Sequence, residues 1–221
     1  MKSTFLLFVF SIALTSCSTQ TINSATKTQF SPEPSVNPEI TQSIPNLSPD
    51  TPISKALTIS PTGIGVANLG MTFGQLKQAV GNNAKFQVVS PFIVDLDAIS
   101  ISQSGKIQYY ILYPAKTTFA NSDSIELLLT ENSNFRTVEG VGPGISLKQA
   151  EAVYGEATLT YNTQNESREQ VKFANQPAEK LLFQPIAPNQ DFAGIYPSQS
   201  GEYNETKKFQ ESAIIRSVLV Q

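Results

Sequence analysis

The chain has 221 residues and a formal net charge of −3, and it contains one cysteine and no histidine. One cysteine excludes a disulfide within the chain, and the lack of histidine removes the usual general base and imidazole metal ligand. The charges form no basic stripe, which argues against nucleic acid as a partner.

The first 16 residues have the pattern of a signal peptide. Lys2 precedes the apolar run "FLLFVFSIAL", which is too short to cross a bilayer but has the length of a signal-peptide core. The next residues, "LTSC", resemble the lipobox of bacterial lipoproteins, which implies cleavage before Cys17 and lipidation of its thiol. An ordinary secretory signal is the alternative. Ser18 replaces the aspartate that usually retains such proteins in the inner membrane, so we expect an extracytoplasmic protein on the periplasmic face of the outer membrane rather than the plasma membrane.

A polar segment follows the cysteine. Of the 39 residues from 18 to 56, 25 are Ser, Thr, Pro, Asn or Gln, and the apolar residues among them have no period. Such a composition cannot bury enough surface to offset the entropy of ordering. We therefore expect residues 17–56 to be a lipidated cysteine with a disordered tether, and residues 57–221 to form the folded part.

The folded part contains one pattern twice. The two segments are "GMTFGQLKQAVG" at 70–81 and "GISLKQAEAVYG" at 144–155. In each, Thr72 or Ser146 is placed to cap a short helix, apolar residues follow on one face, and Gly81 or Gly155 ends it. A helix of about two turns is too short to be stable alone and must pack on other elements. The pattern predicts two α+β units, 57–137 and 138–221.

Strand patterns follow each predicted helix. Alternation of apolar and polar residues and a "QSGK" turn at Gln103–Lys106 predict antiparallel strands with one hairpin. The predicted strands are 86–89, 91–102, 106–113 and 124–130, then 170–174, 180–187, 192–197 and 213–221. The expected fold class is α+β, with two tandem helix-plus-antiparallel-strands units packed as one domain.

These motifs carry a family resemblance. A glycine, then "GMT" or "GIS", a short helix and a closing glycine resemble the repeat of exported bacterial proteins related to β-lactamase inhibitor protein. They also resemble the small lipoproteins of the outer-membrane β-barrel assembly machine. The segments "RTVEGVGPGISLKQAEAVYG" and "YNTQNESREQVKFA" look most like an uncharacterised bacterial lipoprotein family. The resemblance implies a short helical element packed on an antiparallel sheet. The inhibitor's disulfides have no counterpart here, because this chain has a single cysteine.

Carboxylates are the main chemical groups left for a site. Asp95 and Asp97 are two residues apart, but the next acidic residues are distant in sequence, so we expect a solvated strand or bend and no metal. Glu166 and Glu169 flank Arg168, a pattern typical of a surface ion-pair cluster. The glycines of "GVGPG" lack the residues of a phosphate-binding loop, and we interpret them as turn geometry rather than as an anion site.

One long segment contains the candidate binding residues. "QDFAGIYPSQSGEYNE", residues 190–205, is polar, contains glycine and proline, and holds three aromatic residues. Long loops of this kind usually bind or pack. We therefore expect Phe192, Tyr196 and Tyr203 to contact a partner.

The function predicted from the sequence is a non-catalytic binding or scaffolding role at the cell envelope, with a protein partner and no cofactor. Membrane attachment through Cys17 is part of this prediction. One alternative is a carrier that holds a small apolar ligand between sheet and helices. The other is a histidine-free hydrolase with two carboxylates in a cleft.

Overall fold

The computed structural model describes residues 55–197 and 201–221. The predicted signal peptide, Cys17 and nearly all of the predicted tether lie outside the described residues. The folded part combines two α-helices with mostly antiparallel strands, so the coarse α+β prediction is confirmed.

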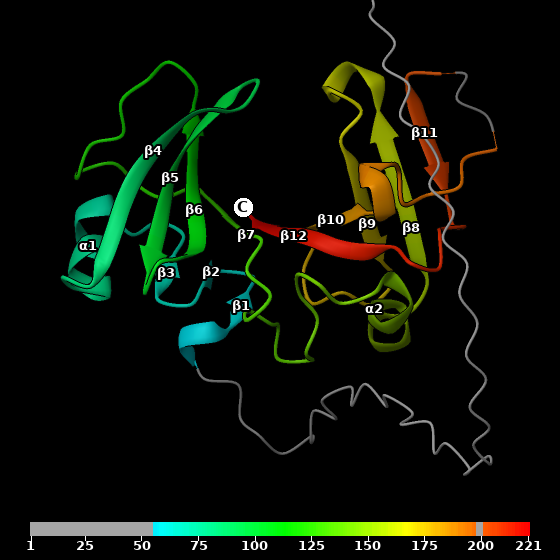
Figure 1. Ribbon diagram of the computed structural model, residues 1–221, viewed down its shortest axis with the longest axis horizontal. Helices are drawn as coiled ribbons and strands as arrows, with labels where there is room; N and C mark the ends of the chain where they lie inside the picture. Colours follow the sequence, from blue (N-terminus) through cyan, green and yellow to red (C-terminus); the bar gives the residue numbers. More distant parts are fainter. Residues whose placement is uncertain (1–54, 198–200) are drawn as a thin grey trace, which may run out of the picture. The chain divides into compact units, whose positions relative to one another are not determined.

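The main element is a nine-stranded antiparallel sheet with the order β11-β8-β9-β10-β12-β7-β6-β5-β4 (Figure 1). Its strands are β4 (Ala84–Ile93), β5 (Leu96–Gln103), β6 (Lys106–Pro114), β7 (Leu127–Thr130), β8 (Ala157–Asn162), β9 (Glu169–Phe173), β10 (Leu181–Ile186), β11 (Tyr203–Thr206) and β12 (Ile214–Val220). We call α1 with β4–β7 the first half and α2 with β8–β12 the second half. The last strand, β12, joins them, because Val218 pairs with Phe183 on β10 and with Thr130 on β7.

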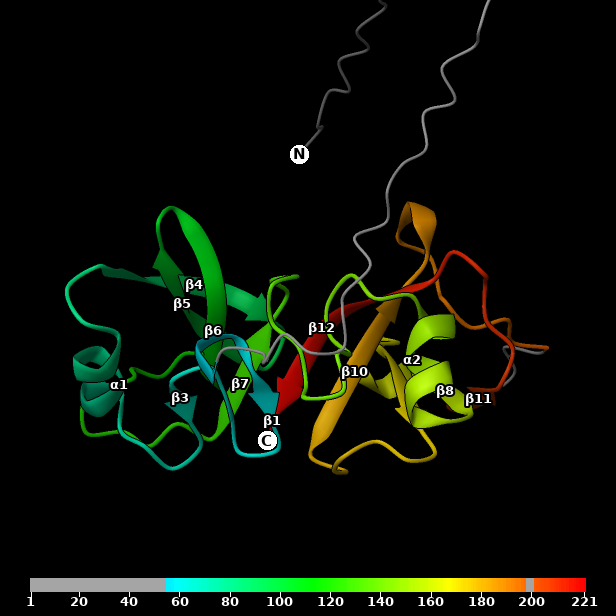
Figure 2. The same cartoon turned by 90° about the horizontal axis from the view of Figure 1, so that it is seen from below.

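A small sheet lies beside this junction. It consists of β1 (Ile59–Ser60), β2 (Gly63–Ile64) and β3 (Ala67–Asn68), preceded by the 3₁₀ turn η1 (Lys55–Leu57). Figure 2 shows β1 next to β7 at the centre of the sheet. The N–H of Ile59 donates to the carbonyl of Arg136 over 2.7 Å, which ties the small sheet to the segment after β7. Two-residue strands have no readable period, and the sequence did not predict them.

The two predicted helices are present as α1 (Phe73–Val80) and α2 (Leu147–Tyr154). Each begins with a full capping box: the hydroxyl of Thr72 or Ser146 accepts from the third helical N–H, and a glutamine side chain accepts from the cap N–H. Each ends at a glycine with positive φ, 70° at Gly81 and 78° at Gly155. A Cβ at Gly155 would lie 2.9 Å from the Nδ2 of Asn175, so this turn requires glycine for space as well.

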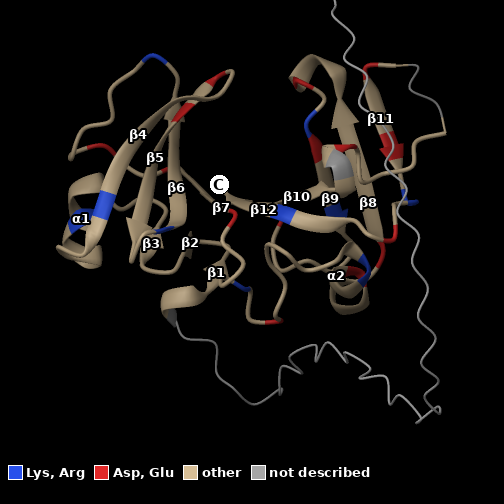
Figure 3. Cartoon of the chain, viewed as in Figure 1, with Lys and Arg blue, Asp and Glu red and all other residues tan. Residues whose placement is uncertain are grey.

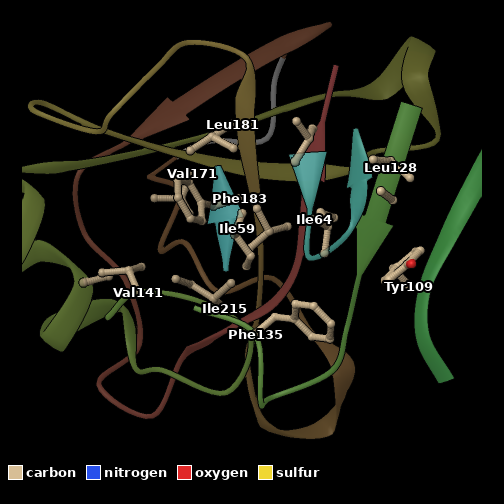
Figure 4. Packing of buried hydrophobic residues seen from close by; sticks show 14 of the residues in the cluster. Ile59, Ile64, Tyr109, Leu128, Phe135, Val141, Val171, Leu181, Phe183 and Ile215 are labelled. Carbon is tan, nitrogen blue, oxygen red and sulfur yellow. The ribbon is translucent and has the colours of Figure 1, made fainter. Parts of the chain in front are cut away.

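One apolar cluster joins both halves. Charged residues lie mostly in loops and near strand ends (Figure 3), whereas the cluster in Figure 4 draws on α1, α2, the small sheet and the main sheet. Ile59, Ile64 and Phe135 are at most 1% exposed in its centre. Ile111 belongs to this cluster but its neighbour Leu112 does not, because adjacent strand residues point to opposite faces. The helices and the small sheet therefore cover one face of the main sheet, and we call the opposite side the open face.

The strand predictions are partly confirmed. The Gln103–Lys106 hairpin is present, and Ser104 and Gly105 both have positive φ, as a two-residue turn of this type requires. The predicted strand 91–102 is two strands, β4 and β5, which meet at a turn after Ile93. β8 and β11 were not predicted.

The predicted strand 192–197 was wrong. This segment contributes only an isolated bridge between Gly194 and Phe209. Its backbone N–H groups at Ala193 and Gly194 donate to the side chain of Glu169 instead of to a neighbouring strand.

Candidate binding site

The tip of the β4–β5 hairpin folds over the open face. The register of β4 against β5 shifts between Val89 and Ile93, where β4 has more residues than β5. Within this irregular stretch, Phe92 reaches across β5 and packs against Tyr110 on β6, with ring centroids 4.9 Å apart. A second, smaller apolar cluster forms beneath, with Leu129 buried in it. The hairpin tip therefore forms an apolar wall on the open face.

The β8–β9 connection forms the facing wall. It contains the 3₁₀ turn η2 (Thr163–Asn165), followed by Glu166 and Ser167, both with left-handed φ near 53°. Arg168 pairs with Glu166 over 3.3 Å and donates to the Oδ1 of Asn165. Glutamates stand on both sides of Arg168, one in this connection and one at the start of β9 (Figure 3). This part of the predicted surface ion-pair cluster is confirmed.

Glu169 has a different role from the one predicted. Its side chain points toward the helix-covered face and is only 9% exposed. Its carboxylate accepts the N–H of Ala193, the N–H of Gly194 and the hydroxyl of Tyr196, over 2.7 to 2.8 Å. A Cβ at Gly194 would lie 2.7 Å from the Tyr196 ring and 2.8 Å from a Glu169 oxygen, so this close approach requires glycine. Glu169 therefore fastens the 190–197 loop to β9.

The loop also packs through its aromatic residues. The Phe192 ring stacks on Tyr161 with centroids 4.5 Å apart, and Tyr196 meets Tyr161 edge-on at 4.7 Å. Burial, and then the hydrogen bond and negative charge of Glu169, raise the pKa of the Tyr196 hydroxyl well above its usual value. Tyr161, which the sequence analysis did not single out, is the centre of this aromatic group.

The floor of the space between the two walls contains an ion pair. Arg216 on β12 lies 3.1 Å from Glu131, which follows β7. Burial is the main cause that raises the pKa of Tyr110, and the negative charge of Glu131 adds to it, while Arg216 acts in the opposite direction. Because Glu131 belongs to the first half and Arg216 to the second, the ion pair crosses the junction between the two halves of the sheet.

These parts enclose a groove of about 540 Å³ on the open face. Its apolar lining comes from the hairpin tip, β7, the end of β10 and Phe192, while three carboxylates and two arginines supply its charge. The charged side chains are Glu131, Glu166, Asp191, Arg168 and Arg216, for a net charge of −1. Glu169 also lines the groove, but its carboxylate points toward the opposite face. The groove thus combines an apolar wall with charged residues whose net charge is negative.

The predicted binding residues lie in two separate regions. Phe192 lines the groove, and Tyr196 is half-buried beside Glu169. Tyr203 is 60% exposed on β11 and lines a separate hollow over β8 and β9. The structure therefore brings Phe192 and Tyr196 together, with ring centroids 5.8 Å apart, but places Tyr203 on another surface. Cys17 lies outside the described residues.

The carboxylates considered as metal ligands are also separated. Asp95 lies in the turn between β4 and β5, whereas Asp97 is buried on β5 and accepts the N–H of Lys116 over 3.0 Å. Among the residues that the structure describes, no group of three or more His, Cys, Asp or Glu side chains is placed to hold a metal ion. No helix within the described ranges is long and apolar enough to cross a membrane.

Comparison of the chain with protein-family models, with curated proteins and with solved structures found no match in any of the three.

Proposed function

We propose that the protein is a lipid-anchored extracytoplasmic lipoprotein with a non-catalytic binding or scaffolding role at the cell envelope. The observation that carries the binding role is the groove on the open face, where Phe92 and Ile93 face a charged wall across the β7–β12 junction. The anchor rests on the "LTSC" motif at Cys17. A protein partner fits this combination better than a small molecule, because the groove is open and lined by separated apolar and charged patches.

The charge of the groove indicates the chemistry of the partner segment. Three carboxylates against two arginines attract positive charge, while the apolar wall favours burial of an aliphatic or aromatic side chain. Asp191 is exposed at the rim, where it can meet a cation from the partner. We therefore propose a partner segment that carries both basic and apolar side chains.

The hydrogen bonds of the groove carboxylates favour binding over hydrolysis. Glu131 and Glu166 are each paired with an arginine, and Glu169 accepts three hydrogen bonds from its own chain. Carboxylates that catalyse glycoside hydrolysis need oxygens free to protonate a leaving group or to attack. These three side chains instead position the walls of the groove. The charged lining likewise gives little support to a carrier for an apolar ligand.

We infer further that residues 57–137 and 138–221 are two tandem copies of one helix-plus-strands unit. Both helices have eight residues, the same capping box and the same closing glycine. In both halves the strand after the helix is followed by an antiparallel hairpin partner and then by a third strand toward the junction. On this inference the groove lies where the two copies meet.

The test is cross-linking of the full-length lipidated protein in intact cells, followed by identification of the co-purified protein. Asp191→Lys reverses a charge at the groove rim, and Glu211→Lys makes the same change at an exposed loop position outside the groove. We expect Asp191→Lys to reduce recovery of the partner roughly fivefold or more, and Glu211→Lys to leave it unchanged. Equal recovery with both variants would refute the groove as the binding site.

Localisation is tested separately. Cys17→Ser should release the protein from the membrane fraction or leave an uncut precursor, because the thiol that carries the lipid is gone. A variant that is processed and anchored like the wild type would contradict the anchor. If no envelope protein is recovered with the correctly anchored wild type, the binding role itself is contradicted.

A further inference from the structure

The two edges of the nine-stranded sheet differ in how they are protected. β11 forms one edge and β4 the other, and Figure 1 shows them at opposite ends of the sheet. β11 has four residues, includes Glu205 and is followed by Lys207 and Lys208. Short, charged strands resist the addition of another strand. The β11 edge is therefore protected.

The β4 edge has little of this protection. It has ten residues, and Ala84 to Val89 pair with β5 in unbroken register. Lys85 is the single charge in this stretch, and Val88 is 61% exposed. Pro91 and the register shift lie beyond Val89, so they leave the regular stretch accessible. In an antiparallel edge strand about half of the backbone N–H and C=O groups point away from the sheet.

The second half shows how the corresponding strand is covered. β8, the first strand after α2, pairs on its outer side with β11 over Leu159 to Asn162. β4 is the first strand after α1, and within the described residues no strand pairs with its outer side. The chain thus fills one of two corresponding positions with its own antiparallel strand.

We propose that residues 84–89 of β4 bind an extended segment of a partner protein as an additional antiparallel strand. Strand addition of this kind takes its affinity from backbone hydrogen bonds and its selectivity from alternate side chains. Val88 offers an apolar contact to one side of the added strand.

Positively charged side chains near β4 indicate that the partner segment also makes a charged contact. Lys85 is exposed on the strand itself, and the Nζ of Lys77 lies 5.6 Å from the centre of the Phe86 ring. Lys106 pairs with Gln103, which also pairs with Ala84 at the start of β4. No acidic residue lies within 84–93. The partner segment therefore carries apolar residues in alternation and a carboxylate opposite Lys85.

This inference rests on protein binding as the function but not on the groove. β4 residues 84–89 do not line the groove, so variants in each surface report separately. Loss of groove binding with retained β4 binding would refute only the groove. The reverse result would refute only the added strand.

The first experiment places a photo-cross-linking residue at exposed Gln87 of the lipidated full-length protein in intact cells. The matched control carries it at exposed Lys148 on α2. We expect an adduct from position 87 that maps to a partner segment with alternating apolar residues and an Asp or Glu, and none from position 148. Equal adducts from both positions, no adduct, or an adduct to a second copy of this chain would each overturn the proposal.

The second experiment tests the backbone hydrogen bonds directly. The probe is a synthetic heptapeptide, Thr-Val-Glu-Val-Thr-Val-Thr, with its termini blocked, and the control is the same peptide methylated at alternate amide nitrogens. We expect the full-length protein to bind the first at least about tenfold more tightly, because methylation removes the N–H donors. Equal affinities would show a side-chain contact without strand addition and overturn the proposal.

Two variants complete the test. Val88→Lys adds a charge to the exposed edge and should abolish peptide binding, whereas Val153→Lys, on the exposed side of α2, should not. Lys85→Glu should lower the affinity for the glutamate peptide. It should raise the affinity for the same peptide with lysine in place of glutamate. Circular dichroism checks that each variant is folded, and a charge preference that does not invert would refute the contact at Lys85.

Discussion

The two halves of the domain have the same helix caps but differ in their longest connections and at the sheet edges. α1 and α2 each begin at a hydroxyl cap three residues before a glutamine and end at a glycine with positive φ. By contrast, the connection after β6 spans residues 115–126, whereas the one after β10 spans 187–213 and contains β11. β11 covers one sheet edge, whereas no strand among the described residues covers the outer side of β4.

This difference separates the geometry that both halves share from the surfaces in which they differ. The capping boxes satisfy backbone groups that would otherwise be orphaned, so neither helix can change them without loss. The edges and connections carry no such demand. Both proposed binding surfaces, the groove and the β4 edge, are built from parts in which the halves differ.

The largest expected effect tests whether the halves unfold together. Leu76 in α1 and Leu147 in α2 are fully buried in the same cluster. Replacement of either by alanine should lower the free energy of unfolding by about 2–5 kcal/mol. Because one sheet and one core join the halves, denaturant unfolding followed by circular dichroism should remain a single transition. Two separate transitions in either variant would contradict this coupling.

The next effect concerns alkaline stability and a tyrosine in the first half. Burial raises the pKa of Tyr109 from 10.0 to about 12. The stabilising contribution of the neutral hydroxyl is fully present below pH 10 and is lost as the pH rises from 10 to 12, at about 1.4 kcal/mol per pH unit. Tyr109→Phe should therefore lose less stability than the wild type between pH 9 and about pH 11.5. Parallel losses in urea titrations at the two pH values would show that Tyr109 does not titrate on unfolding.

A smaller effect is expected at the loop fastening of the second half. Glu169→Gln exchanges an acceptor oxygen for an amide donor opposite the N–H of Ala193 or Gly194, and should cost about 1–3 kcal/mol. Hydrogen exchange at these two amides should become faster. The control Glu166→Gln disrupts an exposed ion pair and should cost at most about 1 kcal/mol. Unchanged exchange at Ala193 and Gly194 would rule out the fastening role.

The smallest effect compares the two helix caps. Thr72→Ala and Ser146→Ala should each lower the free energy of unfolding by about 1 kcal/mol, because each removes one acceptor of a capping box. Ser133→Ala, at an exposed loop position, is the control. Thermal denaturation measures all three, and clearly unequal cap effects would break the comparison between the halves.

The sequence of β8 contains a local strand pattern. In β8, "ATLTYN", Ala157, Leu159 and Tyr161 are buried in alternation with partly exposed residues, which is the ordinary period of a strand. The apolar and aromatic run 192–197 was predicted as a strand because its composition suits one. Its N–H groups are instead satisfied by Glu169, a residue 24 positions earlier, and no local pattern indicates such a partner.

The groove was equally beyond reach of the sequence. Phe92 forms part of it only because a register shift of β4 carries the side chain over β5 to Tyr110. Glu131 and Arg216 are 85 residues apart and meet because β12 returns to pair with β7. Of the predicted binding residues, Phe192 lines this groove, while Tyr203 lines another hollow.

The helices, their caps and the β5–β6 hairpin follow from the local sequence, because each depends on interactions among residues a few positions apart. It also supplies the lipobox pattern on which the anchor prediction rests. Three other features depend on the tertiary structure. They are the joining of the halves by β12, the choice of the edge that β11 covers, and the choice of the face that the helices cover. These features arise from pairing between distant strands, whose partners are selected by burial of the common core rather than by local sequence.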